Sequence, residues 1–391
     1  MTPLTIAYVV NAKVPEEVRA QKICASLAAL GHNVILACKW SGEIEEREHM
    51  DGYQILRIGK DRIMATCFPG NPTWTSALSN IIEEMQLDII ICREMIPMMS
   101  CLRARKHTSI PIILDMAEHY PAAMREWKKY NNHGLTGLLI HHTALPDLIE
   151  SHAIQHADAI ITVCEEQENR LIEQFSYAKD ALFLAHNTPD LNSFSTVKKG
   201  SLHPPIMFGH HGYFTLERNL EMLVEGFDLA AKRFPYIKLM LSGIGETFED
   251  VVQCAQQCEA KDRILFTGAY KAHDLIHLYS QTDIGIMPYA EQEFRQYTLP
   301  NKAFDYMACG KPIISSALKP MKRLLDESHA GIYGDCSNSQ HIAELINRMM
   351  QTNTEEMSKN GQYYHQKKYH WEHDSQHIQA AISYVLESNF S

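Results

Sequence analysis

The sequence predicts an α/β fold made of two Rossmann-like, doubly wound domains. The first observation is a series of short, almost wholly apolar segments, which is typical of parallel strands buried on both faces. The second is that segments with apolar residues at helical spacing separate these strands. The third is a polar stretch at residues 187–205, ending in Pro204 and Pro205, after which the strand–helix alternation begins again.

The first half supplies the elements of one domain. A strand is predicted at residues 4–10, and the helix expected at 16–30 stops at Gly31. Further strands are expected at residues 33–38, 88–92, 111–114, 158–163 and 181–184. These elements predict an N-terminal domain of residues 1–195.

The second half repeats the pattern. Strands are predicted at residues 206–210, 236–241, 263–266, 283–288 and 312–315. Helices are predicted at residues 216–233, 248–259, 273–281, 301–309 and 337–350. These elements predict a C-terminal domain of residues 200–370. An amphipathic helix is expected at 371–386, and the segment 371–391 is expected to pack back on the N-terminal domain.

Composition excludes several classes of protein. The 391 residues carry a net charge of −11, which argues against a general nucleic-acid binder. The sequence contains no run of 18 apolar residues, so no membrane-spanning helix is predicted. Residues 1–10 predict a strand and lack the basic segment that begins a signal peptide. The ten cysteines form no CxxC pair. We therefore expect a cytoplasmic protein, with the inner face of the membrane as the alternative location.

The most informative segment is Tyr297-Thr-Leu-Pro-Asn-Lys-Ala-Phe-Asp-Tyr-Met-Ala-Cys-Gly310-Lys-Pro-Ile-Ile. Pro300 suits a helix start, where free backbone amides and the helix dipole attract a phosphate. Lys302 adds a positive charge there, and Asp305, one turn along, can accept hydrogen bonds from a ribose. The alternative is an ordinary amphipathic helix that stops at Gly310.

This segment resembles the "PNKxFEYMAxGKPVI" signature of retaining glycosyltransferases of the GT-B fold, family 4-like and of group 1. Further similarity lies, in the expected order, in 212–227, 243–245, 266–288, 114–121, 158–163 and 187–190. The resemblance implies two domains facing across a cleft and transfer of a sugar from a nucleoside-diphosphate sugar. It also implies a glycan, lipid-linked or small-molecule acceptor, and no cofactor, metal or nucleic acid.

The resemblance assigns roles to particular residues. Asp305 matches the carboxylate that holds the ribose, and Arg218 matches the basic residue that pairs with the diphosphate. Residues 267–270 lie where the family recognises the nucleobase. The donor-binding residues implied are Gly212, Arg218, Thr267, Gly268, Tyr270, Tyr297, Thr298, Leu299, Asn301, Lys302 and Asp305. Glu118 and His119 are the catalytic candidates.

Two departures from the family pattern keep other functions open. Tyr297 stands where the family has the first Glu of its E-x7-E motif, and Ala117 stands where it has a His. These changes would suit a catalytically silent partner subunit that binds nucleotide-sugar. An epimerase of the same fold is the other alternative, and it would need two carboxylates around the sugar.

The remaining polar features have structural alternatives. His210 and His211 end a predicted strand and would either line the sugar site or have a structural or solvent role. The pairs His152/His156, His273/His277 and His373/His377 lack an HExxH glutamate and are expected on helix surfaces. A basic cluster would allow peripheral membrane contact, with a solvated charged face as the alternative; it comprises Arg103, Arg105, Lys106, Arg125, Trp127, Lys128 and Lys129.

Overall fold

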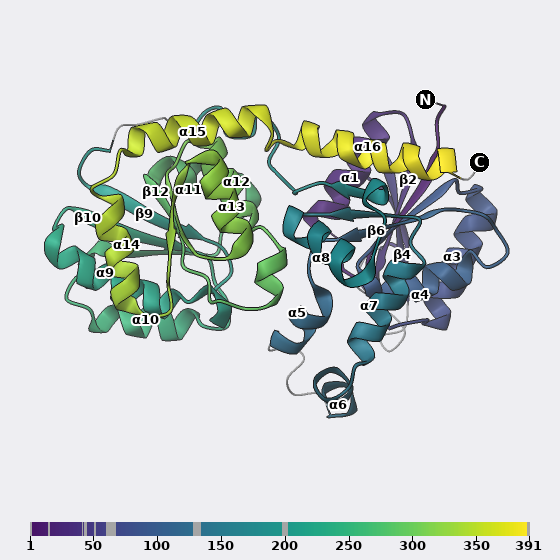
Figure 1. Ribbon diagram of the computed structural model, residues 1–391, viewed down its shortest axis with the longest axis horizontal. Helices are drawn as coiled ribbons and strands as arrows, with labels where there is room; N and C mark the ends of the chain where they lie inside the picture. Colours follow the sequence, from purple (N-terminus) through teal and green to yellow (C-terminus); the bar gives the residue numbers. More distant parts are fainter. Residues whose placement is uncertain are drawn as a thin grey trace. The chain divides into compact units, whose positions relative to one another are not determined.

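The computed structural model describes residues 2–14, 16–40, 42, 45–50, 52–59, 68–127, 134–197 and 202–388. The chain forms two compact units (Figure 1). The first contains the residues up to Asn187 and those from Asp374 onward, and the second is Thr188–His373. Each unit has a mainly parallel sheet between helices, which confirms the predicted class of two Rossmann-like domains.

The sheet of the first unit has eight strands in the order β3-β4-β2-β1-β5-β6-β7-β8. Their bounds are Thr5–Val9 (β1), Asn33–Lys39 (β2), Arg47–Met50 (β3), Tyr53–Ile58 (β4), Ile89–Arg93 (β5), Ile112–Met116 (β6), Ala159–Thr162 (β7) and Leu182–Leu184 (β8). Strands β3 and β4 were not predicted from the sequence, and β3 pairs antiparallel with β4 at one edge of the sheet. Only two residues separate these strands, which is a hairpin connection and too short for a parallel crossover.

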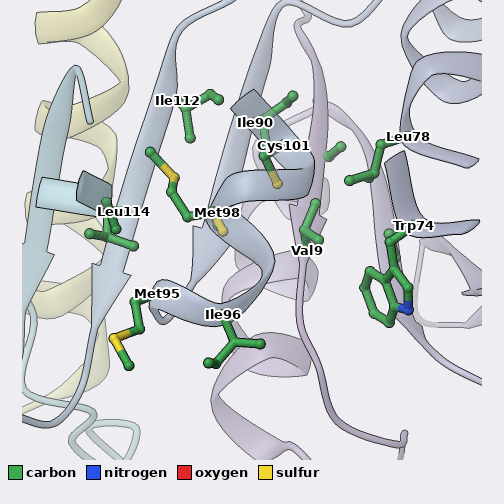
Figure 2. Close-up of a cluster of buried hydrophobic side chains, with 14 of the residues drawn as sticks. Val9, Trp74, Leu78, Ile90, Met95, Ile96, Met98, Cys101, Ile112 and Leu114 are labelled. Carbon is green, nitrogen blue, oxygen red and sulfur yellow. The ribbon is translucent and has the colours of Figure 1, made fainter. Parts of the chain in front are cut away.

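Helices cover both faces of this sheet. Their bounds are Val18–Ala29 (α1), Pro72–Met85 (α3), Met95–Ala104 (α4), Tyr120–Glu126 (α5), Gly134–His142 (α6), Leu145–Gln155 (α7), Glu165–Phe175 (α8) and Trp371–Ser388 (α16), with a 3-10 turn at Lys179–Ala181. Helix α3 begins where it does because the Asn71 side chain accepts hydrogen bonds from the amides of Thr73 and Trp74. Trp74 belongs to the cluster of buried hydrophobic side chains that also contains Ile90 and Met98 (Figure 2).

The sheet of the second unit has six strands in the order β11-β10-β9-β12-β13-β14, all parallel. Their bounds are Ile206–His211 (β9), Ile237–Ser242 (β10), Ile264–Gly268 (β11), Ile284–Met287 (β12), Ile313–Ser316 (β13) and Gly331–Gly334 (β14). The helices are Leu220–Arg233 (α9), Phe248–Gln257 (α10), Leu275–Gln281 (α11), Asn301–Ala308 (α12), Lys319–Ser328 (α13), Ser339–Met349 (α14) and Thr354–Lys367 (α15). Short 3-10 turns lie at Leu216–Arg218, Lys261–Arg263, Ala272–Asp274 and Phe294–Tyr297.

The helices of this unit divide between the two faces of its sheet. Helices α9, α10 and α14 lie on one side, and α11, α12, α13 and α15 lie on the other (Figure 1). Phe227 of α9 and Ile346 of α14 are buried against Phe208 and Leu239 of the strands. In the strand order, the chain proceeds from β9 through β10 to β11 in one direction, and from β12 through β13 to β14 in the other. Ligands of open α/β sheets bind beside such a switch point.

Two predicted helices begin later than the sequence indicates. The helix expected from Leu216 starts at Leu220, because Asn219 adopts a left-handed conformation with φ 58°. The Asn219 side-chain amide donates to the Cys336 carbonyl at 2.7 Å, which holds this break in place. Arg218 therefore lies in a 3-10 turn before α9, not one turn into a helix. Likewise, the helix expected from His273 starts as α11 at Leu275.

Candidate functional site

The switch point of the second unit brings Gly212 and Lys302 together. Gly212 follows β9 with φ +148°, a conformation that a side chain rarely adopts. A Cβ atom at this position would lie 2.6 Å from Cε and 2.7 Å from Nζ of Lys302. Because Gly212 has no side chain, the ammonium group of Lys302 can lie directly against the loop that follows β9.

A cluster of cations surrounds Tyr289 beside this point. The guanidinium carbons of Arg218 and Arg295 lie 4.5 Å and 4.7 Å from the Tyr289 ring centre. Burial alone would raise the pKa of Tyr289, but the charges of Arg218, Lys302 and Arg295 lower it below its usual value. Arg295 also pairs with Glu217 at 3.8 Å, whereas Nε of Arg218 is buried with no hydrogen-bond partner among the described residues. The arrangement is suited to an anion.

Asp305 lies one turn along α12 from Lys302. Its Oδ2 accepts a hydrogen bond of 2.8 Å from the hydroxyl group of Tyr279, a buried residue of α11. Burial and the Asp305 charge raise the pKa of Tyr279 well above its usual value, so this hydroxyl stays a donor. Burial, and then the charges of Asp305 and Tyr289, raise the pKa of Tyr270 to about 12.

The chain is open to solvent where β11 ends and the following turn begins, at Thr267 and Gly268. Thr267 is exposed, and a Cβ atom at Gly268 would meet nothing within 4 Å. The Gly268 carbonyl accepts a hydrogen bond from the Gly243 amide at 2.8 Å, which fixes the turn. A flat ligand group can therefore approach the backbone here, as the sequence resemblance implies for Thr267, Gly268 and Tyr270.

The segment before α12 presents its backbone at Leu299. The Leu299 side chain is buried, so only its main chain can face a ligand. Pro300 precedes the helix, and the amides of Asn301 and Lys302 have no acceptor within α12. Thr298 is extended, and the Tyr297 ring lies 5.9 Å from the Lys319 ammonium. The phosphate-binding geometry expected of a helix N-terminus is therefore available beside Lys302.

A cavity of about 560 Å³ adjoins this site at the carboxyl ends of β12, β13 and β14. Tyr289, Glu291, Ser316 and Asp335 are among its lining residues. Its lining offers hydrogen-bond donors and acceptors next to the cation cluster.

His210 and His211 are structural residues of β9, both fully buried. Nδ1 of His210 lies 2.9 Å from the Ile286 carbonyl oxygen, and Nε2 of His211 lies 2.9 Å from Oγ1 of Thr282. Burial and the Lys302 charge lower both pKa values, that of His211 to about 3. The solvent role considered from the sequence is therefore wrong, and neutral rings here add no charge beside Lys302.

The catalytic candidates Glu118 and His119 belong to the first unit, where they have different surroundings. Glu118 lines a cavity of about 230 Å³ at the carboxyl ends of the strands. The buried His119 instead has Nε2 4.0 Å from Oε2 of Glu150, which is paired with Arg170. Burial, and then the Arg170 charge, lower the pKa of His119 to about 3. Within the described residues, Glu118 and not His119 reaches the cavity.

The same cavity contains a residue that the sequence reasoning missed, Glu94. It follows β5 and, like Glu118 after β6, stands at the end of a buried strand. Its position directly after an apolar strand was the available signal, since ligands gather at the carboxyl ends of parallel strands.

The predicted basic cluster is largely engaged within the first unit. Arg103 donates to the Gly70 carbonyl at 2.7 Å, Arg105 pairs with Asp158, and Arg125 pairs with Asp147. Lys128 and Lys129 lie outside the described residues. These contacts favour the alternative of a solvated charged face over a membrane-binding surface.

The described part of the chain contains no metal-like cluster of side chains and no membrane-spanning helix. No three His, Cys, Asp or Glu side chains in that part of the chain converge as a set of metal ligands. Likewise, none of its helices is both long and apolar enough to cross a bilayer.

Two family models match the chain, one in each half. Residues 195–368 match the model described as glycosyl transferases group 1, and residues 17–193 match the model described as glycosyltransferase family 4. The cation cluster, Asp305 and the open turn at Gly268 all lie within the first of these matches, and the cavity with Glu94 and Glu118 lies within the second.

Two curated proteins are similar to part of the chain. One is TuaH of Bacillus subtilis, named for teichuronic acid biosynthesis, at 23% identity over 181 residues, covering 45% of this chain and 44% of that protein. The other is a chitobiosyldiphosphodolichol beta-mannosyltransferase of Debaryomyces hansenii, at 22% identity over 221 residues, covering 50% of this chain and 46% of that protein. Both matches span less than half the length of these relatives.

Solved structures resemble the chain over nearly its whole length. A sucrose-phosphate synthase from Thermosynechococcus elongatus superposes with a TM-score of 0.77 at 15% identity, covering 98% of this chain and 100% of that one. Anabaena HepE in complex with UDP-glucose superposes with a TM-score of 0.70 at 14% identity, covering 97% of this chain and 99% of that one. At these identities the likeness bears on the fold alone.

Proposed function

The chain belongs to the glycosyltransferases of the GT-B fold, and from this membership we propose that it transfers a sugar from a nucleoside-diphosphate sugar to an acceptor hydroxyl, with retention of anomeric configuration. The observation that carries the proposal is the gathering of Arg218, Arg295 and Lys302 at the switch point of the second unit. Such a cluster beside a helix N-terminus is suited to a diphosphate.

The proposed donor site assigns one role to each part of the second unit. Arg218, Lys302 and the first amides of α12 bind the diphosphate. Asp305 accepts hydrogen bonds from the ribose hydroxyls, and the open turn at Gly268 takes the nucleobase. The transferred sugar occupies the adjoining cavity of about 560 Å³.

The proposed chemistry is displacement at the anomeric carbon. The bond from this carbon to the diphosphate oxygen breaks, and a bond to the acceptor oxygen forms on the same face. The acceptor's proton passes to the departing phosphate oxygen. Negative charge develops on the diphosphate, where Arg218, Lys302 and the α12 amides stabilise it, and no metal ion is required.

A second candidate function is a silent subunit that binds nucleotide-sugar without turnover. Tyr297 and Ala117 favour it, since the family has a glutamate and a histidine at these positions and this chain has neither. This candidate predicts donor binding without release of nucleoside diphosphate under any condition.

One experiment separates the two candidates. The purified protein is incubated with UDP-, GDP- and ADP-sugars and a set of glycoside acceptors, and release of nucleoside diphosphate is measured beside donor binding by calorimetry. Release that needs an acceptor supports the transferase, and NMR of the product gives its anomeric configuration. Binding without release supports the silent subunit, and neither binding nor release contradicts both.

A further inference from the structure

The cavity of the first unit lies at the carboxyl ends of β1, β5 and β6. Its volume is about 230 Å³, and its lining includes Asn11, Arg93, Glu94, Glu118, Tyr120 and Trp127. The rings of Tyr120 and Trp127 meet edge to face with their centres 5.7 Å apart. A small cavity with aromatic walls and a few polar groups is a typical binding place for a compact polar molecule.

Glu94 places an unsatisfied oxygen at this cavity. Its backbone has φ 62°, at the junction between β5 and α4. Oε1 accepts a hydrogen bond of 3.0 Å from the Ala117 amide, which fixes the carboxyl group. Oε2 is buried and has no hydrogen-bond partner among the described residues. A buried polar atom without a partner costs free energy, and a ligand hydroxyl that pairs with it removes that cost.

The positive charge at the cavity is already neutralised. Nη1 of Arg93 lies 3.1 Å from Oδ2 of Asp115, and its Nε lies 3.7 Å from the carboxylate of Glu17. Asp115 is itself buried and also pairs with Arg19 at 2.8 Å. No uncompensated cation is therefore available to a phosphate here, within the described residues.

The other charges at the cavity are acidic. Glu17 and Glu118 both belong to its lining. A phosphate or carboxylate group in this cavity would meet these carboxylates at short range, where repulsion is only partly screened. Uncharged hydroxyl groups meet no such repulsion.

The protonation state of Glu94 agrees with a neutral ligand. Burial raises its pKa to about 8, the charge of Arg93 opposes this, and Glu118 and Asp115 add to it. Near neutral pH the carboxyl group therefore carries a proton, which Oε2 can donate to a hydroxyl oxygen.

We propose that this cavity binds the acceptor through an uncharged sugar or polyol portion, that Glu94 holds one of its hydroxyl groups, and that an acceptor phosphorylated on this portion is excluded. The proposal rests on the glycosyltransferase function proposed above and adds the class of its acceptor. Glu94 is thereby a specificity-determining residue, and the aromatic wall of Tyr120 and Trp127 packs on the apolar face of the sugar.

The test uses matched acceptors that differ only in charge. Methyl glycosides of glucose, mannose and N-acetylglucosamine are compared with their 6-phosphates as acceptors for the full-length protein. We expect transfer to at least one neutral glycoside, and at least tenfold lower kcat/KM for its phosphate. Transfer to none of the neutral glycosides, or preference for a phosphate, would overturn the proposal.

Variants of Glu94 test the residue itself. Glu94→Ala is expected to raise the acceptor KM at least tenfold, whereas Glu94→Gln keeps a donor in place and stays within about threefold of wild type. The wild-type acceptor KM should rise as pH passes about 8, because binding then buries a charged carboxylate, and the KM of Glu94→Gln should stay flat. Glu173→Ala, at an exposed site on α8, is the control.

Donor binding separates failure of this proposal from failure of the proposed function. UDP-sugar affinity, measured by calorimetry without acceptor, should be equal in wild type, Glu94→Ala and Glu173→Ala. If wild type binds and transfers the sugar but Glu94→Ala has an unchanged acceptor KM, the assignment of Glu94 is wrong while the function stands. If wild type neither binds donor nor transfers sugar, the proposed function itself has failed.

Discussion

Replacement of Asp305 by Asn tests the proposed donor site most directly. The substitution keeps the size of the side chain and an oxygen that can accept from Tyr279, but it removes the negative charge. The buried hydroxyl of Tyr279 therefore keeps its partner, and the melting temperature without ligand should stay close to that of wild type. The ribose hydroxyls lose a charged acceptor.

The expected loss of affinity follows from that charge. A hydrogen bond to a charged group contributes about 1.5–3 kcal/mol, and about 1.4 kcal/mol corresponds to a factor of ten in affinity. Asp305→Asn should therefore weaken binding of a nucleoside diphosphate by roughly tenfold to a hundredfold. Isothermal titration calorimetry of wild type and variant with UDP, GDP and ADP measures this difference.

Tyr279→Phe is the matched control. It removes the hydroxyl that donates to Asp305 but leaves the carboxylate, so nucleotide affinity should be unchanged or higher while stability falls by about 1 kcal/mol. An equal dissociation constant in wild type and Asp305→Asn would refute the ribose assignment. In that case Asp305 would have a structural role, of which the bond to Tyr279 is a part.

Four further outcomes are expected. Gly212→Ala should weaken nucleotide binding at least tenfold by calorimetry, because its Cβ would occupy the place of the Lys302 ammonium; affinity like wild type would contradict this. Arg218→Ala should lower donor affinity and kcat while its urea midpoint stays unchanged, and equal donor affinity would remove Arg218 from the site. Transfer should persist in excess EDTA, and loss restored by Mn²⁺ or Mg²⁺ would refute metal independence. Glu94→Gly should be more stable than Glu94→Ala by about 1 kcal/mol in urea unfolding, because φ 62° strains any side chain, and equal stability would contradict that reason.

The sequence predicts the fold well where one physical signal dominates. Strands such as Ile89–Arg93 are buried on both faces, so their apolar runs stand out from the helices around them. The helices between β6 and β7 are harder to predict, because α5 is only seven residues long and α6 contains two glycines, which have low helix propensity. The start of α9 depends on the left-handed Asn219 and its bond to Cys336, a contact far away in the sequence.

The candidate site, like the fold, is predictable from the sequence only in part. Lys302 and Asp305 lie in one contiguous motif on a single helix, so their proximity follows from helical spacing. Arg295 and Tyr289 join Arg218 only through the fold, and neither has a sequence signal of its own. No sequence pattern decides which of the neighbouring Glu118 and His119 faces the cavity, because the backbone of the turn sets their directions.

The candidate sites of the two units differ in charge, and this difference would decide which ligand each of them binds. In the second unit, cations gather at the proposed donor site, and the neutral ring of His211 adds none, so the site would attract a diphosphate. In the first unit, Asp115 and Glu17 pair with Arg93 and further carboxyl groups line the cavity, so the same diphosphate would be repelled. Discrimination through repulsion needs no additional contact with the correct ligand. If both proposals hold, the carboxyl groups that leave the proposed acceptor cavity open to uncharged hydroxyls also keep the donor out of it.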